Sequence, residues 1–226
     1  MRYPNIHRAT FIERPNRFVA RCLLEGEPIT VHVKNTGRCR ELLVPGAEVW
    51  LTKSDNPARK TAFDLIAVQK GTRLINMDSN APNTAFGEYA RAGKFLLDAQ
   101  NIRSEVRWGD SRFDFCLESG GKTHFIEVKG VTLEEDGAVR FPDAPTERGV
   151  KHLRELQRAA AEGYGAHAVF VIQMKDVTQF SPNDDTHPAF GAALREAAKN
   201  GVQVHAFCCE VTPDTMEITG TVNICL

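Results

Sequence analysis

Two neighbouring β-prone segments carry two carboxylates and a lysine at a spacing that suits metal-dependent chemistry. Asp114 lies within residues 111–115, and Glu127 and Lys129 lie within residues 125–130. Because side chains alternate across a strand, Glu127 and Lys129 project from the same face. If the strands are neighbours, Asp114 joins them, and two carboxylates at one place favour a divalent cation between them. A lysine there would stabilise charge on an attacking water or a phosphate, as in a metal-dependent phosphodiesterase.

A structural interpretation of the same residues stays open. A Glu-x-Lys pattern on a strand also fits a solvated face with a weak surface ion pair. The short link of residues 119–121 is rich in glycine and favours a hairpin between the two segments. That link, together with Asp114 upstream, makes the metal site as well supported by the sequence as the surface ion pair.

Composition places the chain among soluble globular proteins. It has 226 residues, of which 42 % are hydrophobic and 25 % charged. No stretch approaches the ~20 apolar residues of a membrane span. The first eight residues contain no apolar run, so no secretory signal is expected and the predicted location is cytoplasmic. The six cysteines form no Cys-x-x-Cys pair, which argues against a zinc ribbon and favours reduced thiols.

Charge is distributed unevenly along the chain. Residues 1–75 hold 13 Lys and Arg against 7 Asp and Glu, whereas residues 76–226 hold 15 against 22. A basic part joined to an acidic part fits attraction to a phosphate backbone combined with a metal-binding carboxylate site. Chance segregation of surface charge is the alternative.

The first third of the sequence is typical of a small all-β domain. Short β-prone runs are separated by turn residues, and about five strands in this length suggest a closed barrel. We predict an OB-like β-barrel over residues 1–80, basic and able to bind nucleic acid. The expected strands are residues 9–13, 18–25, 29–33, 48–53 and 63–69.

A basic turn lies within this predicted barrel, at residues 32–42. Lys34, Asn35, Arg38 and Arg40 surround an Asn-Thr-Gly turn. Exposed amides near a glycine, flanked by arginines, are suited to binding phosphates. A solvated loop without a ligand is the alternative.

A polar connector at residues 76–83 marks the predicted boundary, and residues 81–226 read as one α/β domain. The pattern indicates a helix from residue 83 or 84, three strands, a helix from Pro145, a buried strand, a helix over 188–200 and a last strand. This order predicts a mixed sheet with helices on both faces. His167 in the buried strand is interpreted as core. Residues 133–144 and 180–185 are expected to be loops.

Glu88 falls on the first predicted helix, opposite its apolar stripe. It is either a surface charge or a third carboxylate directed at the site. The residues alone leave both interpretations open.

The second part resembles the restriction-endonuclease-like (PD-(D/E)xK) nucleases. Their motif is an Asp, a Glu-x-Lys on the next strand and often a Glu from the first helix. Longer stretches are similar to the bacterial sugar fermentation stimulation protein A family over essentially the whole chain; they are residues 32–37, 111–115, 126–133 and 141–156. The resemblance implies an OB-like domain joined to a nuclease-like domain, DNA binding without marked sequence preference, and a role in regulating sugar use, including maltose. One departure is Phe113, which stands where many of these nucleases have proline.

The resemblance also implies a set of site residues. Mg²⁺ or Mn²⁺ would be held by Asp114, Glu127, the peptide carbonyl of Val128 and Glu88, with Lys129 acting on the phosphate or water. Near the start of the second helix, phosphate contacts are expected from Arg148, Lys151 and His152. Asp143 is a further metal candidate.

Two functions remain in view. One is an active nuclease on DNA or RNA, and the other is a DNA-binding module that contacts phosphates and has an idle site. No membrane partner is expected. The sequence leaves open whether the protein forms a homodimer.

Overall fold

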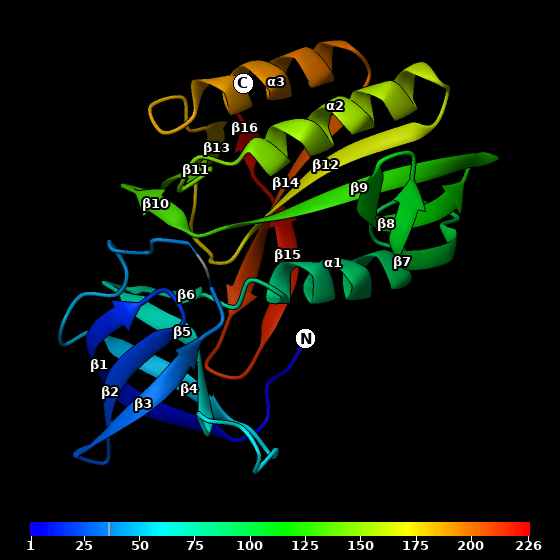
Figure 1. Ribbon diagram of the computed structural model, residues 1–226. Helices are drawn as coiled ribbons and strands as arrows, with labels where there is room; N and C mark the ends of the chain where they lie inside the picture. The colour runs from blue at the N-terminus through cyan, green and yellow to red at the C-terminus, as the bar shows by residue number, and fades with distance from the viewer. Residues whose placement is uncertain (36) are drawn as a thin grey trace.

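The computed structural model describes residues 1–35 and 37–226 as two parts that lie against each other (Figure 1). The first part is a small β-barrel, and the second is a mixed sheet covered by helices on both faces. The predicted fold class, an OB-like barrel followed by a mixed α/β domain, is therefore confirmed.

Five strands curl into the barrel in the order β3-β2-β1-β4-β5, and β6 extends the edge beyond β5. A parallel contact between β3 and β5 closes the ring at Val33 and Leu65, which are both buried. Alternate residues of β2 and β3 are buried, as expected for strands with one face on a core. The bounds are β1 Ile6–Asn16, β2 Val19–Leu24, β3 Glu27–Val33, β4 Glu48–Lys53, β5 Phe63–Lys70 and β6 Arg73–Asn76.

The second part is organised around a six-stranded sheet in the order β15-β14-β12-β9-β8-β7. Its three central strands, β14, β12 and β9, are parallel. Residues 166–172 of β12 are all buried, because helices cover both faces of a parallel centre. The bounds are β7 Gln100–Trp108, β8 Ser111–Ser119, β9 Lys122–Val131, β12 Gly165–Ile172, β14 Gln203–Val211 and β15 Met216–Thr221.

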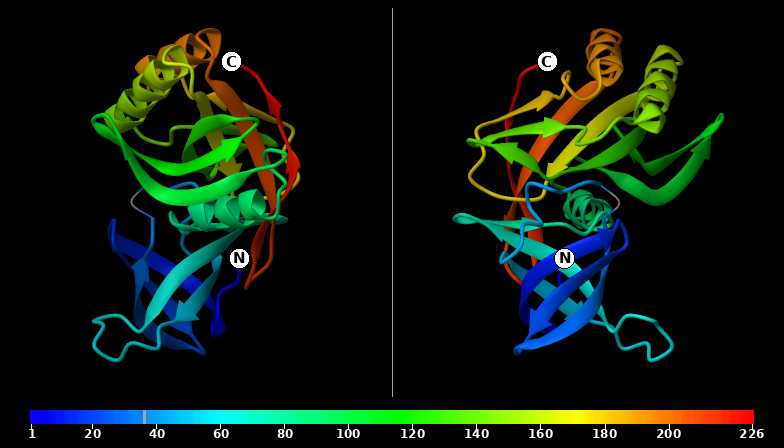
Figure 2. Two further views of the ribbon diagram at one scale, coloured as in Figure 1. Left: turned by 90° about the vertical axis from the view of Figure 1, so that its right-hand side faces the viewer. Right: turned by 60° about the vertical axis from the view of Figure 1, so that its left-hand side comes forward.

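Helix α1 (Ala81–Arg91) covers one face of this sheet, and helices α2 (Glu147–Ala161) and α3 (Pro188–Lys199) cover the other (Figures 1 and 2). Phe86 of α1 packs into the core on its face, whereas Leu156 of α2 and Leu194 of α3 pack into the core on the opposite face. Helix α1 begins two or three residues before the expected start, since its proline fits the first turn. Helix α2 begins two residues after the expected start.

A second, four-stranded sheet occupies two stretches expected to be loops. It runs in the order β10-β11-β13-β16, with bounds β10 Leu133–Glu135, β11 Ala138–Phe141, β13 Gln179–Pro182 and β16 Asn223–Ile224. Val139 and Phe180 are paired across the parallel β11–β13 ladder, and both are completely buried. The loop prediction was therefore wrong at residues 133–135, 138–141 and 180–182, whereas residues 136–137, 142–144 and 183–185 lie outside strands. These strands are too short, and too mixed with charge, to give a periodic signal in the sequence.

Buried polar contacts fix the barrel against the sheet domain. Glu134 is almost fully buried, and its carboxylate bonds Lys70 Nζ at 2.7 Å and Arg73 Nη1 at 3.0 Å on the barrel side. Nearby, the backbone N–H of Asn76 donates to Gln173 O at 2.9 Å. Breaking the contacts of Glu134 would leave a buried charge unpaired. These contacts therefore favour one relative position of the two parts.

None of the described helices combines the length and the apolar character that crossing a membrane requires.

Candidate metal and nucleic-acid site

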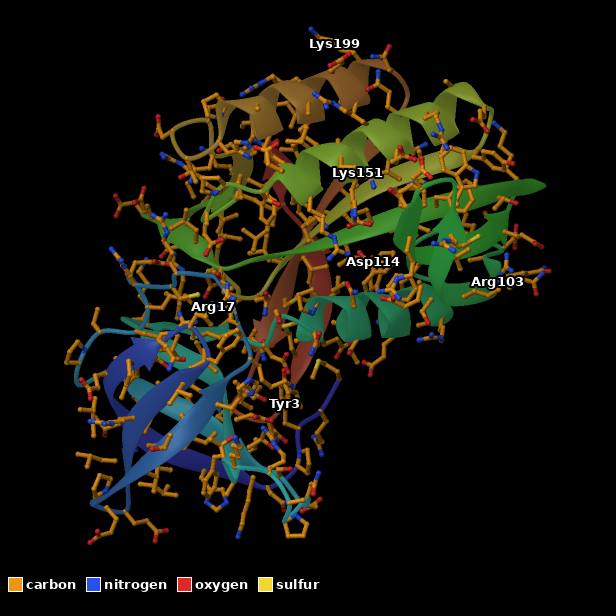
Figure 3. All side chains as sticks on the ribbon, viewed as in Figure 1. Tyr3, Arg17, Arg103, Asp114, Lys151 and Lys199 are labelled. Carbon is orange, nitrogen blue, oxygen red and sulfur yellow. The ribbon has the colours of Figure 1, made fainter. Side chains whose placement is uncertain are left out.

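Asp114 lies where β8 and β9 separate. The ladder between the two strands ends at Phe115, and the two aromatic neighbours of Asp114 pack in different cores. Phe113 packs on Phe125, with ring centroids 5.3 Å apart, whereas Phe115 packs on Phe86 of α1 at 5.2 Å. Residues two apart on a regular strand share a face, but Phe113 and Phe115 do not. Beyond the end of the ladder, the Asp114 carboxylate accepts the backbone N–H of Val128 on β9; Figure 3 labels the residue.

Both oxygens of Asp114 are hydrogen-bonded. Asn83 of α1 donates its amide to Oδ1 at 3.0 Å, and the backbone N–H of Val128 donates to Oδ2 at 2.8 Å. Burial and the charge of Glu127 nevertheless raise the pKa of Asp114. Sequence reasoning missed Asn83 as a site residue, because nothing in the sequence links positions 31 residues apart.

Glu127 is the most enclosed carboxylate of the site, with 4 % of the residue exposed. Its Oε1 accepts hydrogen bonds from Lys129 Nζ and His152 Nδ1. Burial alone would raise the pKa of Glu127, but these two partners outweigh it and lower the pKa. Its Oε2 is buried and has no hydrogen-bond partner among the described residues. Glu127 is therefore an ionised carboxylate with one unpaired oxygen, and its charge is close enough to Asp114 to raise the pKa of that group.

His152 connects α2 to this carboxylate. It is buried, and Arg148 Nε donates to its Nε2 at 3.3 Å. Since Nε2 accepts in this arrangement, we assign the proton to Nδ1, which then donates to Glu127. The sequence interpretation placed His152 on phosphate, whereas the structure places it behind Glu127, where it orients the carboxylate.

Lys151 remains at the surface beside the site. Its ammonium donates to the backbone carbonyl of Asp110, in the β7–β8 turn, at 3.2 Å. Figure 3 shows Lys151 on α2 above Asp114. Helix α2 therefore carries Arg148 and Lys151 on the side of the site where His152 meets Glu127, and their contact with phosphate stays a prediction.

Glu88 is not drawn into the hydrogen-bonded cluster. Its carboxylate bonds the N-terminal ammonium of Met1 at 2.6 Å, and its side chain is 55 % exposed. It lines a cavity of about 450 Å³ that also reaches Asn83 and Asp114. Asp114, Glu127 and the peptide of Val128 are thus held together, and Glu88 stands at the rim.

The donor set fits a hard divalent cation. Carboxylate and carbonyl oxygens are the ligands that Mg²⁺ and Ca²⁺ prefer. The buried, unpaired Oε2 of Glu127 and the raised pKa of Asp114 are both relieved by a positive charge between the two carboxylates. No group of three His, Cys, Asp or Glu side chains with metal-binding geometry occurs among residues 1–35 and 37–226, so two carboxylates, backbone and water would form the coordination shell.

The basic turn of the barrel divides into two roles. Lys34 does not face a groove, because its ammonium pairs with the buried carboxylate of Asp78 at 2.5 Å. Asn35 shapes the turn, donating to Met77 O at 3.0 Å and accepting from Gly37 N at 2.7 Å. These two residues hold the turn, and Thr36 lies outside the described residues.

Arg38 and Arg40 are exposed and line a groove of about 290 Å³ together with Arg14 and Arg17. Arg14 supports the groove from inside, since its guanidinium donates to the carbonyl oxygens of Asn35, Arg17 and two further turn residues at 2.6–2.9 Å. Arg17 lies over the ring of Phe18, 4.7 Å from its centroid. Within the part of the chain that the structure describes, no carboxylate pairs with the guanidinium groups of Arg17, Arg38 and Arg40, so they are open to phosphate.

Comparison with known proteins gives one consistent result. Residues 12–77 match the family model "SfsA N-terminal OB domain", and residues 80–215 match "Sugar fermentation stimulation protein RE domain". The sugar fermentation stimulation protein homologs of Desulfitobacterium hafniense strain Y51 and Clostridium beijerinckii are 55 % and 52 % identical to the chain, over 99 % and 100 % of it and over 98 % and 100 % of their own lengths. The structure of Pyrococcus furiosus SfsA in complex with Ca²⁺ superposes with a TM-score of 0.91 at 26 % identity, covering 100 % of this chain and 98 % of that one.

Proposed function

The chain belongs to the sugar fermentation stimulation protein family, and we propose that it binds nucleic acid without marked sequence preference and cleaves its phosphodiester bonds with a divalent cation. The observation that carries the proposal is the unpaired, buried Oε2 of Glu127 beside Asp114. A buried ionised oxygen without a partner is costly, and such groups concentrate at functional sites. The Ca²⁺ complex of the Pyrococcus relative supports a divalent cation on this fold.

Asp114, Glu127 and the Val128 carbonyl would hold Mg²⁺ or Mn²⁺. The bound cation would lower the pKa of a water and neutralise charge on the phosphate. Asn83 and the Val128 N–H fix the orientation of Asp114, and His152 fixes that of Glu127. These contacts place the ligands before substrate arrives, which is how outer partners raise metal affinity.

Lys129 would stabilise the scissile phosphate. Its ammonium is held by Glu127 at the same fork, so it need not reorganise when negative charge grows on the phosphate oxygens. Hydrolysis adds water to phosphorus and breaks a phosphorus–oxygen bond to the leaving sugar oxygen. Arg148 and Lys151 on α2 would hold neighbouring phosphates of the strand.

The barrel would supply backbone affinity through Arg17, Arg38 and Arg40. Contacts from these arginines to phosphate carry no base information, which accounts for the predicted lack of sequence preference. Binding should weaken steeply as salt rises.

The direct test is incubation of the purified protein with single- and double-stranded DNA and with RNA, in Mg²⁺ or Mn²⁺. We expect cleavage that EDTA stops and that Glu127→Gln abolishes. Glu118→Gln, an exposed carboxylate of the same sheet, is the matched control and should leave the rate unchanged. Absence of cleavage of every substrate in both metals would exclude the nuclease.

Binding without cleavage is the second candidate, favoured by the open arginine groove of the barrel. It predicts metal-independent affinity for DNA that is steep in salt and insensitive to Glu127→Gln. Affinity equal at low and moderate salt would contradict it. Regulation of sugar use, including maltose, stays a prediction that would follow from either activity.

A further inference from the structure

A separate cavity lies between the barrel and the sheet domain, beyond the carboxyl ends of β9 and β12. It measures about 350 Å³ and is lined from the barrel side by Asn35 and Gly37, and from the sheet side by Gly130, Thr132 and Gln173, among others. Ligands of open α/β sheets bind in crevices at the carboxyl ends of strands. The carboxylates Asp114 and Glu127 are not part of its lining.

Gln173 gives this cavity a fixed hydrogen-bond acceptor. The residue is 1 % exposed, and its Nε2 donates to Asn76 O, Asn76 Oδ1 and Asp78 O at 3.0–3.1 Å. These bonds set the orientation of the amide. No described residue donates to its Oε1, which lies beside Gly130, where a Cβ atom would approach it to 2.5 Å. Oε1 is not one of the enclosed side-chain atoms that lack a partner, and Gln173 lines the cavity, so a donor on a ligand in the cavity can reach this oxygen.

The other polar groups of the cavity indicate what that ligand is. Thr132 lines the cavity and is 8 % exposed, and its hydroxyl is not one of the enclosed side-chain atoms that lack a partner. Asp143 adds a carboxylate, of which Oδ2 accepts from the Arg38 N–H at 3.2 Å. Among the described lining residues none is Lys or Arg. Acceptors without a cation disfavour a phosphate and favour a neutral ligand that carries N–H donors.

The cavity also has apolar walls, and it adjoins both the arginine groove and the end of β9 that carries Lys129. Phe141, Pro142 and Pro145 line one side. A few fixed polar groups on an apolar wall are typical of sites for flat, small organic groups. Gly37 lines both this cavity and the arginine groove, and Gly130 directly follows Lys129 on β9. The cavity thus adjoins both the backbone-binding groove and the scissile site.

We propose that the cavity receives one nucleobase of the bound strand, with an exocyclic amino group donating to Gln173 Oε1. The inference rests on the proposed function, because that function brings the strand to the cavity mouth. Enzymes that act on nucleic acids read an extruded base by such hydrogen bonds and by packing against apolar side chains. Adenine, cytosine and guanine carry an amino group, whereas thymine and uracil do not, so one position of the strand would disfavour thymine.

Mononucleotides test the cavity separately from cleavage. In metal-free buffer, dAMP, the amino-lacking purine deoxyribonucleoside monophosphate, deoxyribose 5-phosphate and inorganic phosphate are each titrated into the protein and followed by NMR. We expect dAMP to bind about tenfold more tightly than the amino-lacking purine, as for loss of one buried hydrogen bond, and to shift the Gln173 side-chain amide resonance. Equal binding of dAMP and deoxyribose 5-phosphate, or tighter binding of inorganic phosphate, would overturn the proposal.

Variants locate the binding. Thr132→Val keeps the shape of the side chain and should weaken dAMP binding about three- to tenfold, whereas Thr123→Val, on β9 and outside the cavity lining, should not. Gln173→Met removes Oε1 directly but also loses three donated hydrogen bonds, so Thr132→Val keeps the test valid if Gln173→Met fails to fold. Unchanged dAMP affinity in Thr132→Val, with an unshifted Gln173 amide, would exclude this cavity.

Failure of the inference is distinguishable from failure of the nuclease. Glu127→Gln should bind dAMP as the wild type does, although it no longer cleaves. A protein that cleaves DNA but treats dAMP and deoxyribose 5-phosphate alike retains the nuclease and loses the base pocket. A protein that binds dAMP in the cavity but cleaves nothing retains the pocket and loses the nuclease.

Discussion

The barrel and the sheet domain each gather charged side chains at one site, but they hold those side chains differently. Around Glu127 the charged groups are buried and tied by hydrogen bonds to residues of α1, α2 and β9. In the barrel groove Arg38 and Arg40 are exposed, and what is fixed is the backbone beneath them, through Arg14.

This difference matches two kinds of task. Chemistry at phosphorus requires ligands placed to within a fraction of an ångström, which only a locked surrounding provides. Affinity for a backbone of varying sequence requires charge at roughly constant spacing, and flexible arginines supply it. We therefore expect substitutions in the sheet domain to change rate, and substitutions in the groove to change affinity.

Lys129→Ala should give the largest effect and tests the first half of that comparison. Removing one preorganised group that stabilises a transition state lowers the rate about 10²–10³-fold, and DNA affinity should stay within about twofold of the wild-type value. Single-turnover cleavage in Mg²⁺ and fluorescence anisotropy in Ca²⁺ measure the two quantities. Lys122→Ala, an exposed lysine of the same strand, is the control. A loss of affinity as large as the loss of rate would erase the distinction between the two domains.

His152→Ala should give the next largest effect, because His152 acts on the metal only through Glu127. Loss of such an outer partner lowers metal affinity about 10–100-fold. Mn²⁺ titration by calorimetry measures this, and raised metal concentration should restore much of the rate. His152→Asn, which can still donate to Glu127, should recover part of the affinity. If extra metal fails to rescue His152→Ala, the residue has a role other than orienting Glu127.

The sequence predicted the barrel and part of the sheet-domain site, but not all the contacts that complete that site. The strand patterns located the barrel, and the strand-by-strand alternation brought Asp114, Glu127 and Lys129 together. It did not reveal the contact of Asn83 with Asp114, nor that of His152 with Glu127, because both contacts depend on how α1 and α2 dock on the sheet. Helix docking is decided by packing between distant segments, which one sequence does not encode locally.

The basic turn illustrates a second limit. Lys34 and Arg38 look alike in the sequence, four residues apart in one polar stretch. The structure separates them, since Lys34 pairs with the buried carboxylate of Asp78 whereas Arg38 is exposed. Charge patterns therefore marked the basic turn, but only the structure distinguishes a lysine held in a buried ion pair from an exposed arginine, for which phosphate contact stays a prediction.

Lowering the pH should destabilise the sheet domain before it destabilises the barrel. His124, His167 and His205 form a hydrogen-bonded row across β9, β12 and β14, with ring nitrogens 2.9 and 3.1 Å apart. Burial, with the charges of its two neighbours, lowers the pKa of His167 to about 3, and burial lowers that of His205 to about 4. An unfolded histidine has a pKa of about 6.5. Below about pH 6.5 the folded state therefore binds fewer protons than the unfolded state. The neutral histidines make their full contribution to stability above this pH, and the contribution is lost as the pH falls below it.

From His167 alone we expect a loss of about 2 kcal/mol in the free energy of unfolding between pH 7 and pH 5. In the barrel, burial raises the pKa of Asp64, but hydrogen bonds from Arg59 and His32 outweigh this and lower it. Its contribution is therefore lost only below the unfolded value of about 3.9. Urea unfolding at both pH values measures the change, and His167→Gln should show about 2 kcal/mol less pH dependence. Equal pH dependence in wild type and variant would show that the row does not titrate as described.

The groove should give the smallest effect, and it tests the second half of the comparison. Arg38→Ala/Arg40→Ala removes two phosphate contacts, so the slope of log K against log salt should become shallower by about 1.5 and affinity should fall about tenfold at moderate salt. The loss should be the same for unrelated sequences, and single-turnover cleavage at saturating protein should hardly change. Arg103→Ala/Arg107→Ala is the matched control, because both residues are exposed on β7, and Figure 3 places Arg103 at the far end of the sheet domain from Arg17. If the two double variants lose the same affinity, the groove is no more than diffuse positive charge, and the barrel has no defined path for the strand.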